Sequence, residues 1–204
     1  MNQAHPHAGP ALAMLVVDEV PAGLRALDAM LKEAPVDLIG AGTIQDGFYM
    51  IVIGGQVEAL QRSMRRALDS ASMHTIDSVL LPDAEPRILP AIRDGVIRWP
   101  APGDTLGAVQ IATPPGLLRA VDRALKGAAV ELVEMRLGDG LGGRAIASFW
   151  GETSDVEAAI ALARGETADV DPLATVSTSI IRNADPDLAA RLGTPTTFFK
   201  GWRG

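Results

Sequence analysis

The chain has 204 residues, 48% hydrophobic and only 4% aromatic, which suits one or two domains with cores of Ala, Val, Leu and Ile. Its net charge of -7 argues against a nucleic-acid-binding protein, because neutralising phosphates requires a concentrated basic face. The absence of Cys excludes disulfides, thiolate metal ligands and a cysteine nucleophile.

Residues 1–10 lack the apolar core of a secretory signal, and no apolar run approaches the length of a membrane span. We therefore expect a soluble cytoplasmic protein with no membrane partner and a flexible N-terminal tail over residues 1–10.

The first predicted elements are a strand and an amphipathic helix. Leu12 to Val17 is a short apolar run typical of a strand. The next segment repeats apolar residues at helical spacing, which predicts one buried stripe. Its members are Leu24, Leu27, Leu31 and Ala34. Pro35 should end this helix, because the residue before a proline disfavours helical geometry.

The following elements complete a mixed domain. Two β-rich runs, Val36 to Ile39 and Phe48 to Ile53, are separated by a polar, glycine-containing loop. A second helix carries Val57, Leu60, Met64 and Ala67, and a strand over Thr75 to Leu81 precedes a short helix after Pro86. This order predicts an α+β domain with an antiparallel sheet and helices on one sheet face.

The sequence contains two copies of this domain. Residues 11–40 reappear as 105–134 at a constant offset of 94, with eleven of thirty positions identical. A period this long is a whole domain rather than a solenoid repeat. We expect domain 1 over 11–94, a Pro- and Gly-containing linker over 95–104, domain 2 over 105–193, and a C-terminal tail over 194–204.

Few motifs point to chemistry. The run from Gly138 to Gly143 satisfies G-x-G-x-x-G, but it is followed by a strand-like segment instead of the helix that a dinucleotide site requires. A glycine-rich connection between strands is the favoured interpretation. We find no catalytic constellation and no metal site. Lys32 and Lys126 lie at equivalent helix C-terminal ends. There they either interact favourably with the helix dipole or make a contact at the edge of an assembled particle.

The repeated segments resemble the bacterial microcompartment shell domain. The family's helix of the form A-D-A-M-x-K-x-A, followed by V-E-L-I-G, is matched by residues 27–34 and 36–40. The second copy repeats the pattern at 121–128 and 130–133, in the family's unpermuted order.

The resemblance implies two tandem shell domains, each with a ferredoxin-like-type antiparallel sheet flanked by helices. It also implies that three chains form a pseudohexameric trimer with a central pore for small polar metabolites. The implied pore-lining residues are Thr43, Ile44, Gln45, Asp46, Gly47, Gly138, Asp139, Gly140, Leu141, Gly142 and Gly143. Lys32 and Lys126 correspond to the family's tile-edge lysine. The implied partners are other shell proteins and enclosed enzymes.

Two further expectations concern chemistry. Some tandem members of the family bind an iron–sulfur cluster through a pore cysteine, and this chain has none, so we expect no cofactor. We also expect a structural protein and no enzyme. A duplicated α+β regulatory module that binds a small metabolite remains the alternative.

Overall fold

A computed structural model describes residues 11–94, 105–138, 140–170, 175–185 and 187–188. By their internal contacts, residues divide into two compact units, Met1–Ala84 and Glu85–Gly204. The expected tails and the linker lie outside the described residues. No helix among the described residues is both long and apolar enough to cross a bilayer.

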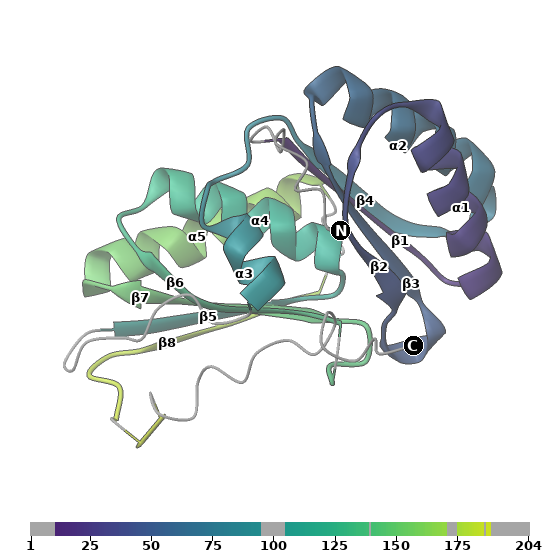
Figure 1. Cartoon of the computed structure of the whole chain (residues 1–204). Helices are drawn as coiled ribbons and strands as arrows, with labels where there is room; N and C mark the ends of the chain where they lie inside the picture. Colours follow the sequence, from purple (N-terminus) through teal and green to yellow (C-terminus); the bar gives the residue numbers. More distant parts are fainter. Residues whose placement is uncertain (1–10, 95–104, 139, 171–174, 186, 189–204) are drawn as a thin grey trace. The chain divides into compact units, whose positions relative to one another are not determined.

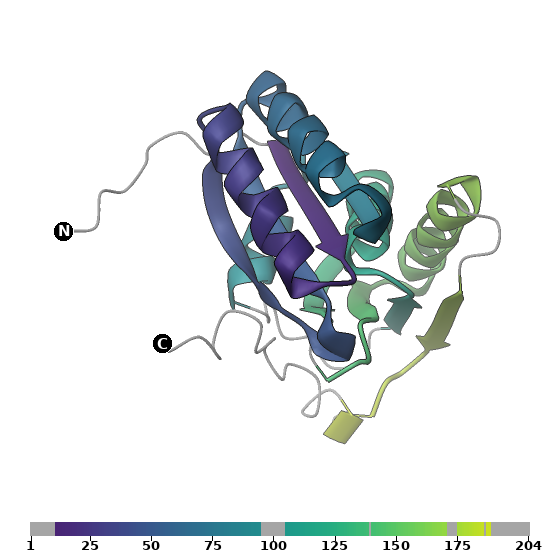
Figure 2. The same ribbon diagram turned by 90° about the vertical axis from the view of Figure 1, so that its right-hand side faces the viewer.

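Unit 1 consists of one antiparallel sheet and two long helices. In chain order its elements are β1 (Ala11–Val17), α1 (Val20–Glu33), β2 (Asp37–Thr43), η1 (Gln45–Gly47), β3 (Tyr49–Gly55), α2 (Val57–Ala71), η2 (Ser72–His74) and β4 (Thr75–Leu81). The strand order is β2-β3-β1-β4, with every neighbouring pair antiparallel. Figure 1 and Figure 2 show α1 and α2 side by side on one face of this sheet.

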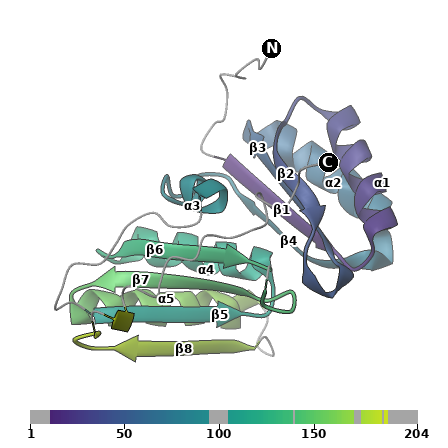
Figure 3. The same cartoon turned by 60° about the horizontal axis from the view of Figure 1, so that its bottom comes forward.

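Unit 2 repeats this plan. Its elements are α3 (Ile88–Asp94), β5 (Thr105–Ile111), α4 (Pro114–Gly127), β6 (Glu131–Leu137), β7 (Ala145–Gly151), α5 (Thr153–Val170) and β8 (Val176–Ile181). The strand order β6-β7-β5-β8 matches unit 1 position by position (Figure 3). The two-domain α+β fold that we expected from the sequence is therefore confirmed.

The boundary between the two compact units lies after Ala84, whereas we expected the first domain to extend to residue 94. Residues 85–94 continue from the last strand of unit 1, and we grouped them with the first domain. In the structure this segment belongs to unit 2, and its helix α3 contacts α4 and β6. Ile88, Ala91 and Ile92 are fully buried there, which explains the assignment.

Alternation along the strands builds the core of unit 1. Ala11, Ala13, Leu15 and Val17 point to the helices, because successive side chains of a strand face opposite sides. Helix α2 covers them with Leu60, Met64 and Ala67, as its spacing predicts. In unit 2 the sheet face away from the helices carries a second small cluster of Leu106, Val133, Trp150 and Ala184, with Ile181 and Leu188 packed against it.

In unit 1 the predicted buried stripe of the first helix is correct for Ala34, which is buried, and for Leu27, which packs partly buried against the core, but wrong for its two other members. Helix α1 instead buries Ala22, Gly23, Ala26 and Met30, while Leu24 and Leu31 are exposed. Small residues on the buried face let the helix approach the sheet closely, and the ring of Tyr49 fills the space over Gly23. The same stripe is largely buried in unit 2, where Leu118, Val121 and Leu125 belong to the core.

Candidate functional site

The connection between β2 and β3 is the first loop that the resemblance marks. Ile44 is buried and anchors it, and its N–H donates to the carbonyl of Phe48 at 2.9 Å. The neighbouring residues Thr43, Gln45, Asp46 and Gly47 are exposed. The loop therefore presents polar groups to solvent from a fixed base.

The tip of this loop has a left-handed backbone. Asp46 has φ 67° and Gly47 has φ 79°. Asp tolerates this region better than most residues, and Gly adopts it without steric strain. A Cβ at residue 47 would meet nothing within 4 Å, so the glycine serves the turn rather than a close contact.

The connection between β6 and β7 is the equivalent loop of unit 2. The N–H of Gly138 donates to the carbonyl of Arg144 at 2.9 Å, and the N–H of Arg144 donates to the carbonyl of Leu141 at 3.2 Å. Gly138, Gly140, Gly142 and Gly143 all have positive φ. A strand follows, so the expected glycine-rich connection is confirmed. Asp139 lies outside the described residues.

The two loops differ in exposure and charge. In unit 2 Gly140 and Gly142 are exposed, Leu141 is half-buried, and Gly138 and Gly143 are buried. Arg144 at the base is exposed, and it was missing from the predicted set because it lies one residue beyond the glycine run. The described part of this loop is thus cationic, whereas Asp46 makes the loop of unit 1 anionic.

A histidine and two carboxylates lie close together at the same end of the unit 1 sheet. The carboxylate of Asp18 lies 2.9 Å from Nδ1 of His74, and Glu19 lies 3.7 Å from the same nitrogen. The N–H of Asp18 also donates to the carbonyl of His74. Sequence reasoning missed this group, because the partners are far apart in the chain and meet only through the pairing of β1 with β4.

The two expected edge lysines have matching local geometry. Lys32 Nζ lies 2.7 Å from Oδ2 of Asp28, and Lys126 Nζ lies 2.8 Å from Oδ2 of Asp122. Both are pairs between residues four apart on a helix. The pair in unit 1 is exposed on both sides and contributes only a few tenths of a kcal/mol, whereas Asp122 of the pair in unit 2 is buried. The lysines are exposed in both units, at the C-terminal ends of α1 and α4.

The described residues hold no group of three or more His, Asp or Glu side chains that could bind a metal ion. What they do offer is a repeated fold with one polar loop at the same end of each sheet. The BMC domain model matches both repeats, at residues 11–84 and 105–184. The chain belongs to the BMC domain family.

Relatives carry the same architecture. The BMC chain is 31% identical over 153 residues to the bacterial microcompartment shell protein PduT of Citrobacter freundii, covering 75% of this chain and 82% of that protein. A crystal structure of a microcompartment protein from Desulfitobacterium hafniense DCB superposes with a TM-score of 0.75 at 28% identity, covering 88% of this chain and 98% of that one.

A more distant structure supports the fold alone. A fused permuted hexameric shell protein from the RMM microcompartment has a TM-score of 0.58 at 21% identity, over 78% of this chain and 81% of that one. The BMC homology assigns this chain a structural role in a microcompartment shell, and the shell proteins related to it are structural rather than enzymatic. A trimer with a central pore is typical of tandem members of this family.

Proposed function

We propose that three copies of this chain close into a pseudohexameric tile of a bacterial microcompartment shell in the cytoplasm. The observation that carries the proposal is the equivalence of the two units, which share strand order, pairing and loop position. Two such units per chain supply six equivalent sheets per trimer. Closed cyclic symmetry is the usual arrangement of homo-oligomers.

The central opening is the proposed route for small polar metabolites. The loops over 43–47 and 138–143 would alternate around it, which gives the opening three-fold symmetry. A unit charge about 10 Å away contributes roughly 0.4 kcal/mol in a water-like dielectric. Three copies each of Asp46 and Asp139 would then oppose an anion by about 2 kcal/mol before salt screening, and three copies of Arg144 would act in the opposite direction.

The rim of the tile is the proposed contact with other shell proteins. Lys32 and Lys126 stand exposed at equivalent helix ends, where the lysine that contacts a neighbouring tile lies in the family. In this proposal the tile separates enclosed enzymes from the cytoplasm. It performs no chemistry itself and needs no cofactor.

Electron microscopy of the purified protein tests the proposal. We expect discs with a hexagonal outline, three-fold internal density and a tendency to form flat arrays. The double variant Lys32→Asp and Lys126→Asp should keep the discs and lose the arrays, since it inverts charge only at the proposed rim. Isolated particles of one chain, with a metabolite-dependent rise in thermal stability, would contradict the tile and favour the regulatory module.

A further inference from the structure

Unit 1 exposes three large leucine side chains, two on α1 and one on the edge strand of its sheet. Leu24 and Leu31 lie on the same face of α1, and Leu38 lies on β2. Their exposed fractions are 52%, 46% and 45%. We call these three residues the leucine patch. An exposed apolar patch on a soluble protein commonly marks an interaction surface.

The same positions of unit 2 are buried. At the offset of 94, the leucine patch corresponds to Leu118, Leu125 and Leu132, whose exposed fractions are 0%, 5% and 0%. Both sets are leucines on the same two elements of the same fold. The difference therefore lies in what covers them and not in the local sequence.

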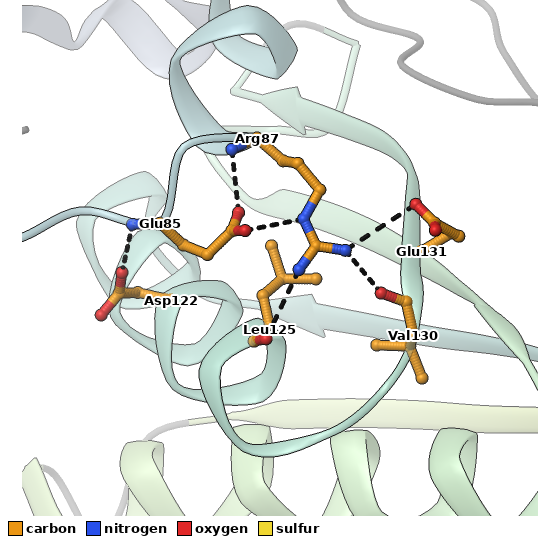
Figure 4. Close-up of polar contacts among 6 residues, drawn as sticks. All are labelled: Glu85, Arg87, Asp122, Leu125, Val130 and Glu131. Carbon is orange, nitrogen blue, oxygen red and sulfur yellow. Dashed lines mark hydrogen bonds and ion pairs between the residues drawn. The ribbon is translucent and has the colours of Figure 1, made fainter.

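In unit 2 the segment that follows β4 packs on this part of the domain. Its helix α3 contacts α4 and β6. The N–H of Glu85 donates to Oδ1 of Asp122 at 2.8 Å, and Arg87 donates to the carbonyls of Val130 at 2.7 Å and Leu125 at 3.4 Å (Figure 4). These bonds fix the segment across the end of α4 and the start of β6.

Unit 1 carries the same acceptors. Asp28 binds Lys32 through Oδ2, as Asp122 binds Lys126, and its Oδ1 accepts no hydrogen bond from the described residues. The positions of Leu125 and Val130 are occupied by Leu31 and Val36. The docking geometry that unit 2 uses is thus present on unit 1, with Oδ1 of Asp28 available.

The chain also contains a second copy of the segment that docks. At an offset of 100, Ile88 and Ile92 correspond to Leu188 and Leu192. The N–H of Arg87 donates to the side chain of Glu85 at 2.9 Å, and the N–H of Asp187 donates to the side chain of Asp185 at 2.8 Å. The two segments therefore begin with the same turn.

We infer that the leucine patch and Asp28 of one chain are covered by residues 185–192 of a second copy of this chain. The inference rests on the proposed ring of three chains, and it assigns the residues that join one chain to the next. Each chain would contribute one internal joint, made by residues 85–92, and one joint between chains, made by residues 185–192.

The two kinds of joint differ at one position. Arg87 of the internal joint corresponds to Asp187, which has no donor for the carbonyls of Leu31 and Val36. Asp187 would also lie near Asp28 and Asp37, the counterparts of Asp122 and Glu131. The joint between chains should therefore be the weaker one. The variant Asp187→Arg should restore the two carbonyl contacts and lower the dissociation constant of the trimer about tenfold or more.

A cysteine pair tests the inference directly, because the chain has no Cys of its own. In Asp28→Cys with Asp185→Cys, mild oxidation should link different chains into covalent dimers and closed trimers. Glu85→Cys with Asp122→Cys is the matched control, and it should oxidise within one chain. The inference would be overturned if the disulfides of Asp28→Cys with Asp185→Cys formed only within one chain. It would also be overturned if this variant formed no disulfide while the control did.

Leucine variants give a second readout that does not depend on oxidation. Leu31→Glu with Leu38→Glu should keep the folded state, since both side chains are exposed in the single chain, and should reduce the trimer to monomers. Met73→Glu is the control, because it charges an apolar residue that is 85% exposed outside the leucine patch. If the double variant stays trimeric, the inference is wrong and the proposed function is unaffected. If the wild-type protein is monomeric, the proposed function itself is wrong.

Discussion

The aromatic ring of Tyr49 lies against the backbone of Gly23. A Cβ on residue 23 would stand 2.4 Å from Cδ1 and 2.6 Å from Cβ of Tyr49. At the corresponding positions of unit 2 the small and the large residue are exchanged. Leu117 replaces the glycine, and Ala145 replaces the tyrosine at the strand position paired with the last residue of the first strand.

Gly23→Ala should therefore destabilise the protein. Alanine favours a helix over glycine by about 1 kcal/mol, but overpacking a dense core costs about 1–3 kcal/mol, and here the clash reaches the Cβ of Tyr49, which cannot swing away. We expect a net loss of about 1–2 kcal/mol in the free energy of unfolding, measured with urea. The double variant Gly23→Leu with Tyr49→Ala copies unit 2 and should recover much of the loss. Unchanged stability in Gly23→Ala would contradict the packing described.

The burial of Tyr49 also predicts that the free energy of unfolding depends on pH. Burial raises the pKa of this phenol above its ordinary value of 10.0. The unfolded chain releases the proton at lower pH than the folded chain, so stability should fall as the pH rises above about 10. Tyr49 is the only tyrosine, so tyrosinate absorbance reports this group alone. Its midpoint should be higher in native than in denatured protein, and Tyr49→Phe should remove this part of the alkaline loss. Equal midpoints would contradict the burial.

Arg87 should stabilise the joint between residues 85–94 and the rest of unit 2. Its side chain pairs with Glu85 at 2.7 Å and donates to the carbonyls of Leu125 and Val130. Arg87→Ala leaves these acceptors without their donor, so we expect a loss of about 2 kcal/mol in urea unfolding. Arg65→Ala is the control, because Arg65 is exposed on α2, and it should change stability by less than about 0.5 kcal/mol. Equal effects of the two variants would contradict the role given to Arg87.

Asp46→Asn tests the proposed opening. Removing three charges about 10 Å from a permeating anion is worth about 1 kcal/mol in water-like dielectric, and screening at physiological salt reduces this to a few tenths. In planar-bilayer recordings of the assembled protein, we expect anion permeability relative to cations to rise severalfold at low salt and about twofold at physiological salt. Glu58→Gln, at the opposite end of the unit 1 sheet, should have no effect. A salt-independent or absent response to Asp46→Asn would place this carboxylate away from the opening.

The sequence predicted the order of elements because strand and helix periodicities are local properties. Val57, Leu60, Met64 and Ala67 lie where their spacing places them. The spacing of apolar residues could not distinguish a helix face that packs on the sheet of its own unit from a face that does not. Leu24 and Leu31 therefore gave a regular stripe that is exposed in the structure, while the small residues of the true core face gave a weak signal.

The candidate site was predicted only in part. The two loops follow from the repeat and the resemblance, and glycine content marked the left-handed backbone of the second. The contact between Asp18 and His74 had no such signal, because it depends on the register of β1 with β4. The same holds for Arg87, whose acceptors come from α4 and the residue preceding β6.

The mass of the protein in solution tests the central claim most directly, since the claim is that each chain contributes two of the six domains of a closed ring. Light scattering coupled to size-exclusion chromatography should give about 64 kDa, three times the chain mass of 21.3 kDa, across micromolar concentrations. A mass of one chain under these conditions, or of an assembly that is no multiple of three chains, would contradict it.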